Sequence, residues 1–125
     1  MFRLAKKQAQ KSSFYRARVG AVITKKKCMV SSAHNATRCY RDPQGFILPR
    51  KVEHALHAEQ AAIIKALNAG LQNDLVGSYL YVTRIKKDGS TAMALPCPTC
   101  QELIISVGIK RVFYTTDTGI ETYDV

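Results

Sequence analysis

The sequence contains no apolar run of about 18 or more residues, so we expect no membrane-spanning helix. Its first residues, 1–7, lack an apolar segment followed by a cleavage site, which argues against a secretory signal. Internal repeats and low-complexity tracts are also missing from the sequence. The chain has 125 residues, of which 46% are hydrophobic, and this predicts a single domain, residues 1–125, whose core needs no disulfides.

Acidic residues are scarce. The sequence has 9 Asp and Glu residues against 19 Lys and Arg residues, which gives a formal net charge of +10. This excess indicates an anionic partner, either nucleic acid or a phosphorylated small molecule. It is equally typical of a protein kept soluble by its charge, so charge alone does not identify a substrate.

The four cysteines, at positions 28, 39, 97 and 100, have irregular spacing. Together with the missing secretory signal, this spacing favours a reduced chain in the cytoplasm. In such a chain a close pair of cysteines is more often metal-binding or catalytic than part of a disulfide.

Hydrophobic patterns typical of helices alternate with patterns typical of strands. Helices are predicted over 1–13, 53–69 and 97–107, and strands over 18–24, 28–33, 78–85, 111–115 and 120–123, with residues 91–95 returning after a turn at 87–90. The alternation predicts an α/β fold with a mixed sheet.

Residues 34–52 have the composition of a loop, and a loop of this length in a small domain usually has a function. Its four basic residues, which we expect to meet a substrate phosphate, are Arg38, Arg41, Arg50 and Lys51.

Cys97 and Cys100 form a Cys-x-x-Cys motif at the start of a predicted helix. The free N–H groups and the dipole of a helix start favour thiolates, and both sulfurs can reach one metal ion. The pair fits half of a structural zinc ribbon, a redox pair, or two ligands of a catalytic zinc. A ribbon needs a second close pair, which the widely spaced Cys28 and Cys39 do not supply. The redox pair stays open on these residues alone.

His57-Ala58-Glu59 begins another predicted helix. One imidazole and two thiolates would leave the fourth position of a tetrahedral zinc open for water, as in catalytic sites. A carboxylate beside the metal and not bound to it, such as Glu59, could then carry protons. Alone, the motif is more typical of a helix start with an acidic residue placed for the dipole. Combined with Cys97 and Cys100, it predicts a zinc enzyme.

The His-x-Glu and Pro-Cys-x-x-Cys motifs resemble those of the zinc-dependent cytidine and deoxycytidylate deaminase superfamily. The resemblance covers most of the chain, including residues 18–23, 57–63, 79–83 and 108–112. It implies a three-layer α/β/α cytidine-deaminase-like fold with a mixed five-stranded sheet. The short turn at 116–119 predicts that the last two strands are antiparallel.

The resemblance also implies roles for individual residues. His57, Cys97 and Cys100 would bind one catalytic zinc ion. A zinc-activated water would attack C4 of cytosine and give uracil, while Glu59 carries a proton to N3 and then to the departing ammonia.

Five further residues are expected in the substrate site by the same resemblance. Asn35 would hydrogen-bond the sugar, although an asparagine after a strand is also a common turn residue. The others, expected around the base, are Ala21, Val22, Ala58 and Pro96.

Two departures from the family pattern bear on the substrate. Residues 84–95 intervene before Pro96, where most relatives pass almost directly from the strand into Pro-Cys, and Leu95 replaces the frequent Glu. Antiparallel last strands resemble the free-nucleoside deaminases, which typically have Cys at the position of His57.

A second, structural zinc could in principle be held by His54 with Cys28, Cys39 or His34. His54 is more typical of an ordinary polar residue at a pocket edge.

We therefore predict hydrolytic deamination of cytosine in a nucleoside or nucleotide, with deoxycytidylate favoured. The alternatives are deamination of cytosine or adenine in RNA or single-stranded DNA, a zinc-stabilised nucleic-acid-binding module without activity, and a redox protein. The resemblance also implies a homo-oligomer.

Overall fold

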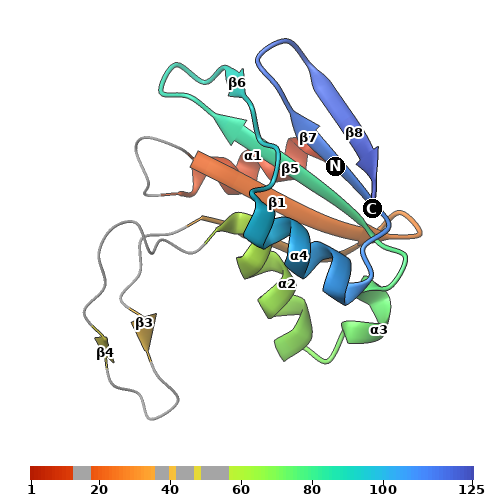
Figure 1. Cartoon of the computed structure of the whole chain (residues 1–125). Coiled ribbons are helices and arrows are strands. Elements are labelled where there is room, and N and C mark those ends of the chain that lie inside the picture. Colours follow the sequence, from red (N-terminus) through yellow and green to blue (C-terminus); the bar gives the residue numbers. More distant parts are fainter. Residues whose placement is uncertain (13–17, 36–39, 42–46, 49–56) are drawn as a thin grey trace.

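A mixed six-stranded sheet forms the centre of the molecule (Figure 1). The computed structural model describes residues 1–12, 18–35, 40–41, 47–48 and 57–125. The sheet order is β2 (Cys28–His34), β1 (Arg18–Lys25), β5 (Tyr79–Ile85), β7 (Arg111–Thr115) and β8 (Ile120–Asp124), with β6 (Thr91–Ala92) paired to the end of β5. The prediction of five strands is therefore wrong by one, because residues 91 and 92 of the returning segment join the sheet.

The directions of the strands follow from the lengths of their connections. β5 and β7 are parallel, and α4 connects them as a crossover. β1 is antiparallel to both β2 and β5. β8 is antiparallel to β7, with Thr115 opposite Ile120, so the prediction from the short turn is confirmed.

A second, two-stranded sheet lies within the segment predicted as a loop. β3 (Tyr40–Arg41) pairs with β4 (Ile47–Leu48) in antiparallel register. The remaining basic positions of that loop, including Arg38 and Arg50, lie outside the described residues.

Helices cover both faces of the main sheet and give the predicted three layers (Figure 1). α1 (Phe2–Gln10) packs on β1 and β5 from one side. α2 (Ala58–Asn68) and α4 (Pro98–Val107) lie next to each other on the opposite side, where the short α3 (Gln72–Leu75) follows α2.

The core lies between the sheet and the α2–α4 layer. From the sheet it takes every second residue of the central strands, since alternate side chains of a strand point to the same face. Its fully or nearly fully buried members include Ala21, Ile23, Leu80, Val82 and Val112 from strands, and Ala58, Ala62, Ile63, Ala66 and Ile104 from helices.

A glycine allows α1 to approach β1 closely. A Cβ atom at Gly20 would collide with the carbonyl oxygen of Ala5 and would lie 2.5 Å from the backbone nitrogen of Ala9. Both alanines are fully buried. Small residues on both elements therefore set the distance between the helix and the sheet.

α4 has the predicted terminal residues. Cys97 is its N-cap and Pro98 its first residue, a position where the missing N–H of proline costs nothing. Gly108 ends it in the left-handed conformation, with φ of 86°. No helix in the described part of the chain has the length and apolar character needed to cross a membrane.

Candidate metal centre and its surroundings

Three predicted metal ligands meet where α2 and α4 begin. His57 caps the start of α2, with extended backbone angles of φ −71° and ψ 149°. Cys97 caps the start of α4, with φ −68° and ψ 165°, and Cys100 lies in its first turn. Residues 40 positions apart in the sequence are thereby brought together at two helix N-termini. The positive end of a helix dipole favours the thiolate form of a cysteine placed there.

The distances between the ligand atoms fit a tetrahedral zinc. Nδ1 of His57 lies 3.3 Å from Sγ of Cys100 and 3.7 Å from Sγ of Cys97. All three ligand atoms lie within 4.8 Å of one another. Bonds of about 2.0–2.1 Å to nitrogen and about 2.3 Å to sulfur place tetrahedral donors about 3.4–3.8 Å apart. The donor set and its spacing therefore match zinc.

The cluster is open on one side. His57 is exposed, Cys97 is half-buried and Cys100 is buried, so the metal position faces solvent through the histidine side. Three protein ligands with solvent access are typical of a catalytic rather than a structural zinc. Elsewhere in the described residues no second group of three such ligands occurs.

Glu59 lies beside this cluster and is 6% exposed. Burial raises the pKa of its carboxyl group, and the hydrogen bond from its own backbone and the charge of His57 oppose the rise. The neighbouring Cys100 thiol lowers this pKa slightly as well. A buried carboxyl group next to metal ligands, with a raised pKa, is what a proton carrier requires.

Burial also raises the pKa of the Cys100 thiol, and the neighbouring Glu59 adds to the rise. The thiol therefore keeps its proton in the absence of a metal. A zinc ion at this position opposes that effect, because a dication favours the deprotonated ligand.

The residues around the cluster are held by hydrogen bonds to the backbone. Gln101 donates to the Pro96 carbonyl oxygen at 2.9 Å, and the backbone N–H of Ala94 donates to the Thr115 carbonyl oxygen at 2.9 Å. The Thr115 hydroxyl donates to the Ala92 carbonyl oxygen and accepts from the N–H of Arg84. These bonds fix the segment that leads into Cys97. Nothing in the sequence pattern marked Thr115 for this role.

Asn35 is placed at the end of β2. Its side-chain oxygen accepts a hydrogen bond from the N–H of Val19 at 2.9 Å, and its own N–H donates to the Val19 carbonyl oxygen at 3.0 Å. Asn35 therefore ties the end of β2 to the start of β1. Its contact with a sugar stays a prediction.

The other predicted substrate residues form buried walls. Ala21, Val22 and Ala58 have no exposed surface, and Pro96 is under 2% exposed. Ala21 and Ala58 belong to the core beside α2. Val22 shares its strand face with Gly20, which is the face that α1 covers. Their contact with a base stays a prediction.

Tyr123 is a residue near the site to which the sequence assigned no role. Its hydroxyl is buried and has no hydrogen-bond partner among the described residues. Burial raises the pKa of this phenol, and the nearby negative charge of Glu59 adds to the rise. Its ring lies 6.1 Å from that of Tyr114. Its place in β8 follows from strand alternation, but its proximity to the metal ligands depends on tertiary packing.

The predicted second metal group is not tested by the fold. Cys28 is exposed at the start of β2, and Nδ1 of His34 lies 3.0 Å from the carbonyl oxygen of Asn35. Cys39 and His54 lie outside the described residues.

Comparison with known proteins decides the family. The model of the cytidine and deoxycytidylate deaminase zinc-binding region matches residues 1–116. The chain belongs to this family. It is a zinc-dependent deaminase of the cytidine and deoxycytidylate type, and His57, Cys97 and Cys100 form its candidate zinc site.

Individual relatives of this deaminase agree with the family match. Deoxycytidylate deaminase of Mycobacterium phage D29 is 30% identical over 127 residues, covering 92% of this chain and 91% of the relative. ComE operon protein 2 of Bacillus subtilis is 29% identical over 120 residues, and the match covers 92% of this chain but only 57% of that protein.

Solved structures confirm the predicted fold class of the deaminase. dCMP deaminase from the cyanophage S-TIM5, solved with dCMP and dUMP, is 29% identical with a TM-score of 0.63, and the match covers 91% of this chain and 76% of that one. Cytidine deaminase from Mycobacterium leprae shares the fold at 18% identity and a TM-score of 0.56, covering 96% and 87% of the two chains.

Proposed function

We propose that this deaminase hydrolyses the C4 amino group of cytosine in a free pyrimidine nucleotide, with deoxycytidylate as the favoured substrate. The observation that carries the proposal is Glu59, a buried carboxyl group beside Cys100 and two residues after His57. Deamination needs one group that accepts a proton and returns it, and Glu59 has the position for both steps.

The proposed chemistry assigns distinct tasks to the residues of the cluster. His57, Cys97 and Cys100 would hold zinc, which supplies an activated water at its open position. Glu59 takes a proton as oxygen adds to C4 and delivers it to N3. Glu59 then takes the second proton from the hydroxyl added at C4 and passes it to the amino group, so that the C4–N bond breaks, ammonia leaves and uracil remains. Because burial raises its pKa, Glu59 is a stronger base than an exposed glutamate and suits both roles.

Support for a nucleotide substrate comes from relatives and charge. The phage relative is named a deoxycytidylate deaminase, and the cyanophage enzyme was solved with dCMP and dUMP. The net charge of +10 suits a phosphorylated substrate. The same charge favours the second candidate, deamination within RNA or single-stranded DNA, which the substrate test separates from the first.

A substrate panel tests the proposal. Zinc-loaded protein is incubated with deoxycytidylate, cytidylate, deoxycytidine, deoxycytidine triphosphate and a cytosine-containing single-stranded oligonucleotide, and ammonia and uracil are measured. We expect the highest kcat/KM with deoxycytidylate. Uracil formed only in the oligonucleotide would overturn the proposed substrate.

Location and assembly are part of the proposal. We place the enzyme in the cytoplasm, as its free cysteines favour, and expect it to form a homo-oligomer. Light scattering coupled to size-exclusion chromatography measures the mass directly. A mass equal to the 13.9 kDa chain at micromolar concentration would contradict the homo-oligomer.

A further inference from the structure

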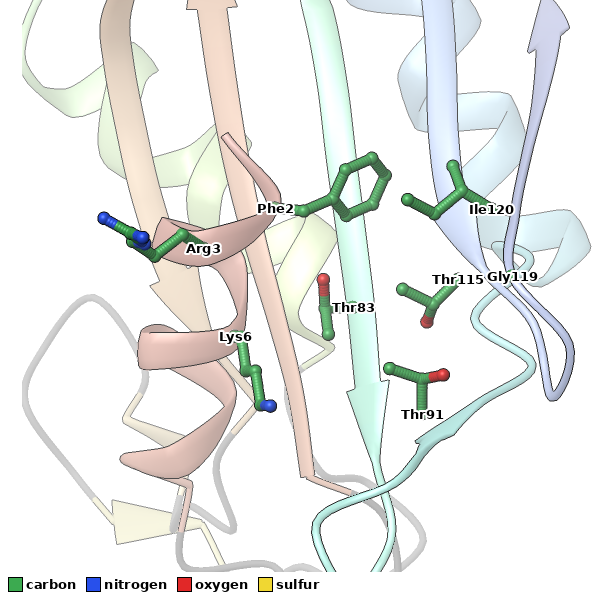
Figure 2. Close-up of a pocket in the computed structure, with 8 residues that line it drawn as sticks. All are labelled: Phe2, Arg3, Lys6, Thr83, Thr91, Thr115, Gly119 and Ile120. Atoms are coloured by element: carbon green, nitrogen blue, oxygen red, sulfur yellow. The ribbon is translucent and has the colours of Figure 1, made fainter.

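A pocket of about 330 Å³ lies on the α1 side of the sheet, opposite to the layer that holds His57 and the cysteines (Figure 2). Its walls come from three places: the first two turns of α1, the adjoining ends of β5, β6 and β7, and the turn into β8. The pocket thus lies outside the metal centre and uses none of its residues.

Most of the pocket wall is apolar. Phe2 and Ile120 contribute an aromatic ring and an aliphatic side chain. Thr91 and Thr115 also line it, but their hydroxyls donate elsewhere, to the carbonyl oxygens of Thr116 at 3.1 Å and Ala92 at 2.9 Å. Figure 2 shows both hydroxyls turned away from Thr83. These two threonines therefore present mainly methyl groups to the cavity.

One polar group in the pocket lacks a partner. Thr83 lies between Lys6 and Thr115 in Figure 2 and is 2% exposed. Its hydroxyl makes no hydrogen bond within the described part of the chain. A buried hydroxyl without a partner is costly to a folded protein, so such groups usually have a ligand, a water or a functional role. Thr83 is also one of the residues that line the cavity.

Two cations border the same cavity. Arg3 and Lys6 lie on successive turns of α1, and neither forms an ion pair with any described residue. No acidic residue among those that the structure describes lines the pocket, and none occurs in the first turn of α1. The N-cap, Met1, gives no side-chain hydrogen bond to the helix start. Figure 2 shows the Arg3 guanidinium directed away from Thr83, so Lys6 and the positive end of the helix dipole are the features that favour a negative charge here.

We propose that this pocket binds a small organic anion that combines an apolar body with a carboxylate or phosphate group. The body packs on Phe2 and Ile120, and the anionic group accepts hydrogen bonds from Thr83 and Lys6. Ligand pockets commonly have this composition, with apolar walls and a few polar groups that fix orientation. Such a ligand bridges α1 and the sheet and stabilises the folded state by mass action.

Three small probes separate the parts of this proposal. Phenyl phosphate has both the body and the charge, phenol has the body, and inorganic phosphate has the charge. Each is titrated into the zinc-loaded full chain while backbone amide shifts are followed by NMR. We expect saturable shifts at Thr83 and Ile120 with phenyl phosphate, and binding at least tenfold weaker with the other two. Equal affinity for inorganic phosphate, or no saturable shift with phenyl phosphate, would overturn the proposal.

Variants and a competing ligand test where phenyl phosphate binds. Lys6→Gln should weaken phenyl phosphate binding about fivefold, the effect of one partly exposed charge. Thr83→Val, which keeps the side-chain volume, should weaken it about tenfold by removing a hydrogen bond to an anion. Lys7→Gln on the same helix does not touch the pocket and should bind as wild type. Displacement of phenyl phosphate by saturating dUMP would place it at the active site and contradict the proposal. Phenyl phosphate binding does not depend on deamination, so protein without deaminase activity should give the same titration curve.

Discussion

Zinc removal should lower the free energy of unfolding, because the metal joins the starts of two helices. His57 precedes α2 and Cys97 precedes α4, and the two helices share only a short contact on the same face of the sheet. At a zinc concentration 100 times Kd, binding stabilises the folded state by about 2.7 kcal/mol. A chain of 125 residues unfolds with an entropy of about 0.26 kcal/mol per degree. Chelation should therefore lower Tm by about 10 °C.

Differential scanning calorimetry of zinc-loaded and chelator-treated protein measures this shift, with bound zinc determined in the same samples. In the His57→Ala variant, the Tm difference between zinc-loaded and chelator-treated protein should largely disappear. Cys28→Ser, which changes an exposed cysteine outside the cluster, should keep it. An equal Tm with and without bound zinc, or a full shift in His57→Ala, would refute the reasoning.

Three further predictions concern pH, packing and a buried hydroxyl. Burial raises the pKa of the Cys100 thiol, so zinc must displace its proton on binding, and zinc affinity should rise with pH between about 6 and 8. Competition with a chromophoric chelator measures the Kd for zinc, and a Kd independent of pH would contradict this prediction. Gly20→Ala should lower the free energy of unfolding by about 1–3 kcal/mol in urea titrations, because the new Cβ collides with the backbone of α1; a variant as stable as wild type would show that α1 can move away freely. Tyr123→Phe should leave stability unchanged or raise it by up to about 1 kcal/mol, since its hydroxyl has no partner among the described residues; a clear loss in the same titration would reveal one.

The Cys97 and Cys100 pair and the order of most elements could be predicted because they depend on local sequence, whereas His57 was assigned to the same metal by the family resemblance. Spacing alone places both sulfurs of Cys97 and Cys100 in one helical turn. Proline at its first position and glycine after its last residue define the ends of α4. The short turn before Ile120 leaves β8 no direction but antiparallel. In each case the determining residues are neighbours in the chain.

The features missed by sequence depend on contacts between distant residues. The turn at 87–90 predicted that residues 91–95 return beside β5, but no local pattern shows the hydrogen bond from the Thr115 hydroxyl, on a third strand, to the Ala92 carbonyl oxygen. α3 is a helix of four residues with one buried side chain, Leu75, which is too short for a periodic pattern. The hydroxyls of Thr83 and Tyr123, which have no partner among the described residues, are a result of packing, since both residues are ordinary strand formers in the sequence.

Glu59→Gln provides the most direct test of the central claim, that a buried carboxyl group beside a zinc site carries the proton in deamination. The amide keeps the size of the side chain but cannot accept and return a proton. We predict that the variant binds one zinc per chain, as wild type does, while kcat for deoxycytidylate falls by about 10²–10⁴-fold. The matched control, Glu102→Gln, changes an exposed carboxylate on α4 and should retain activity. Turnover by zinc-loaded Glu59→Gln at the wild-type rate would contradict the account.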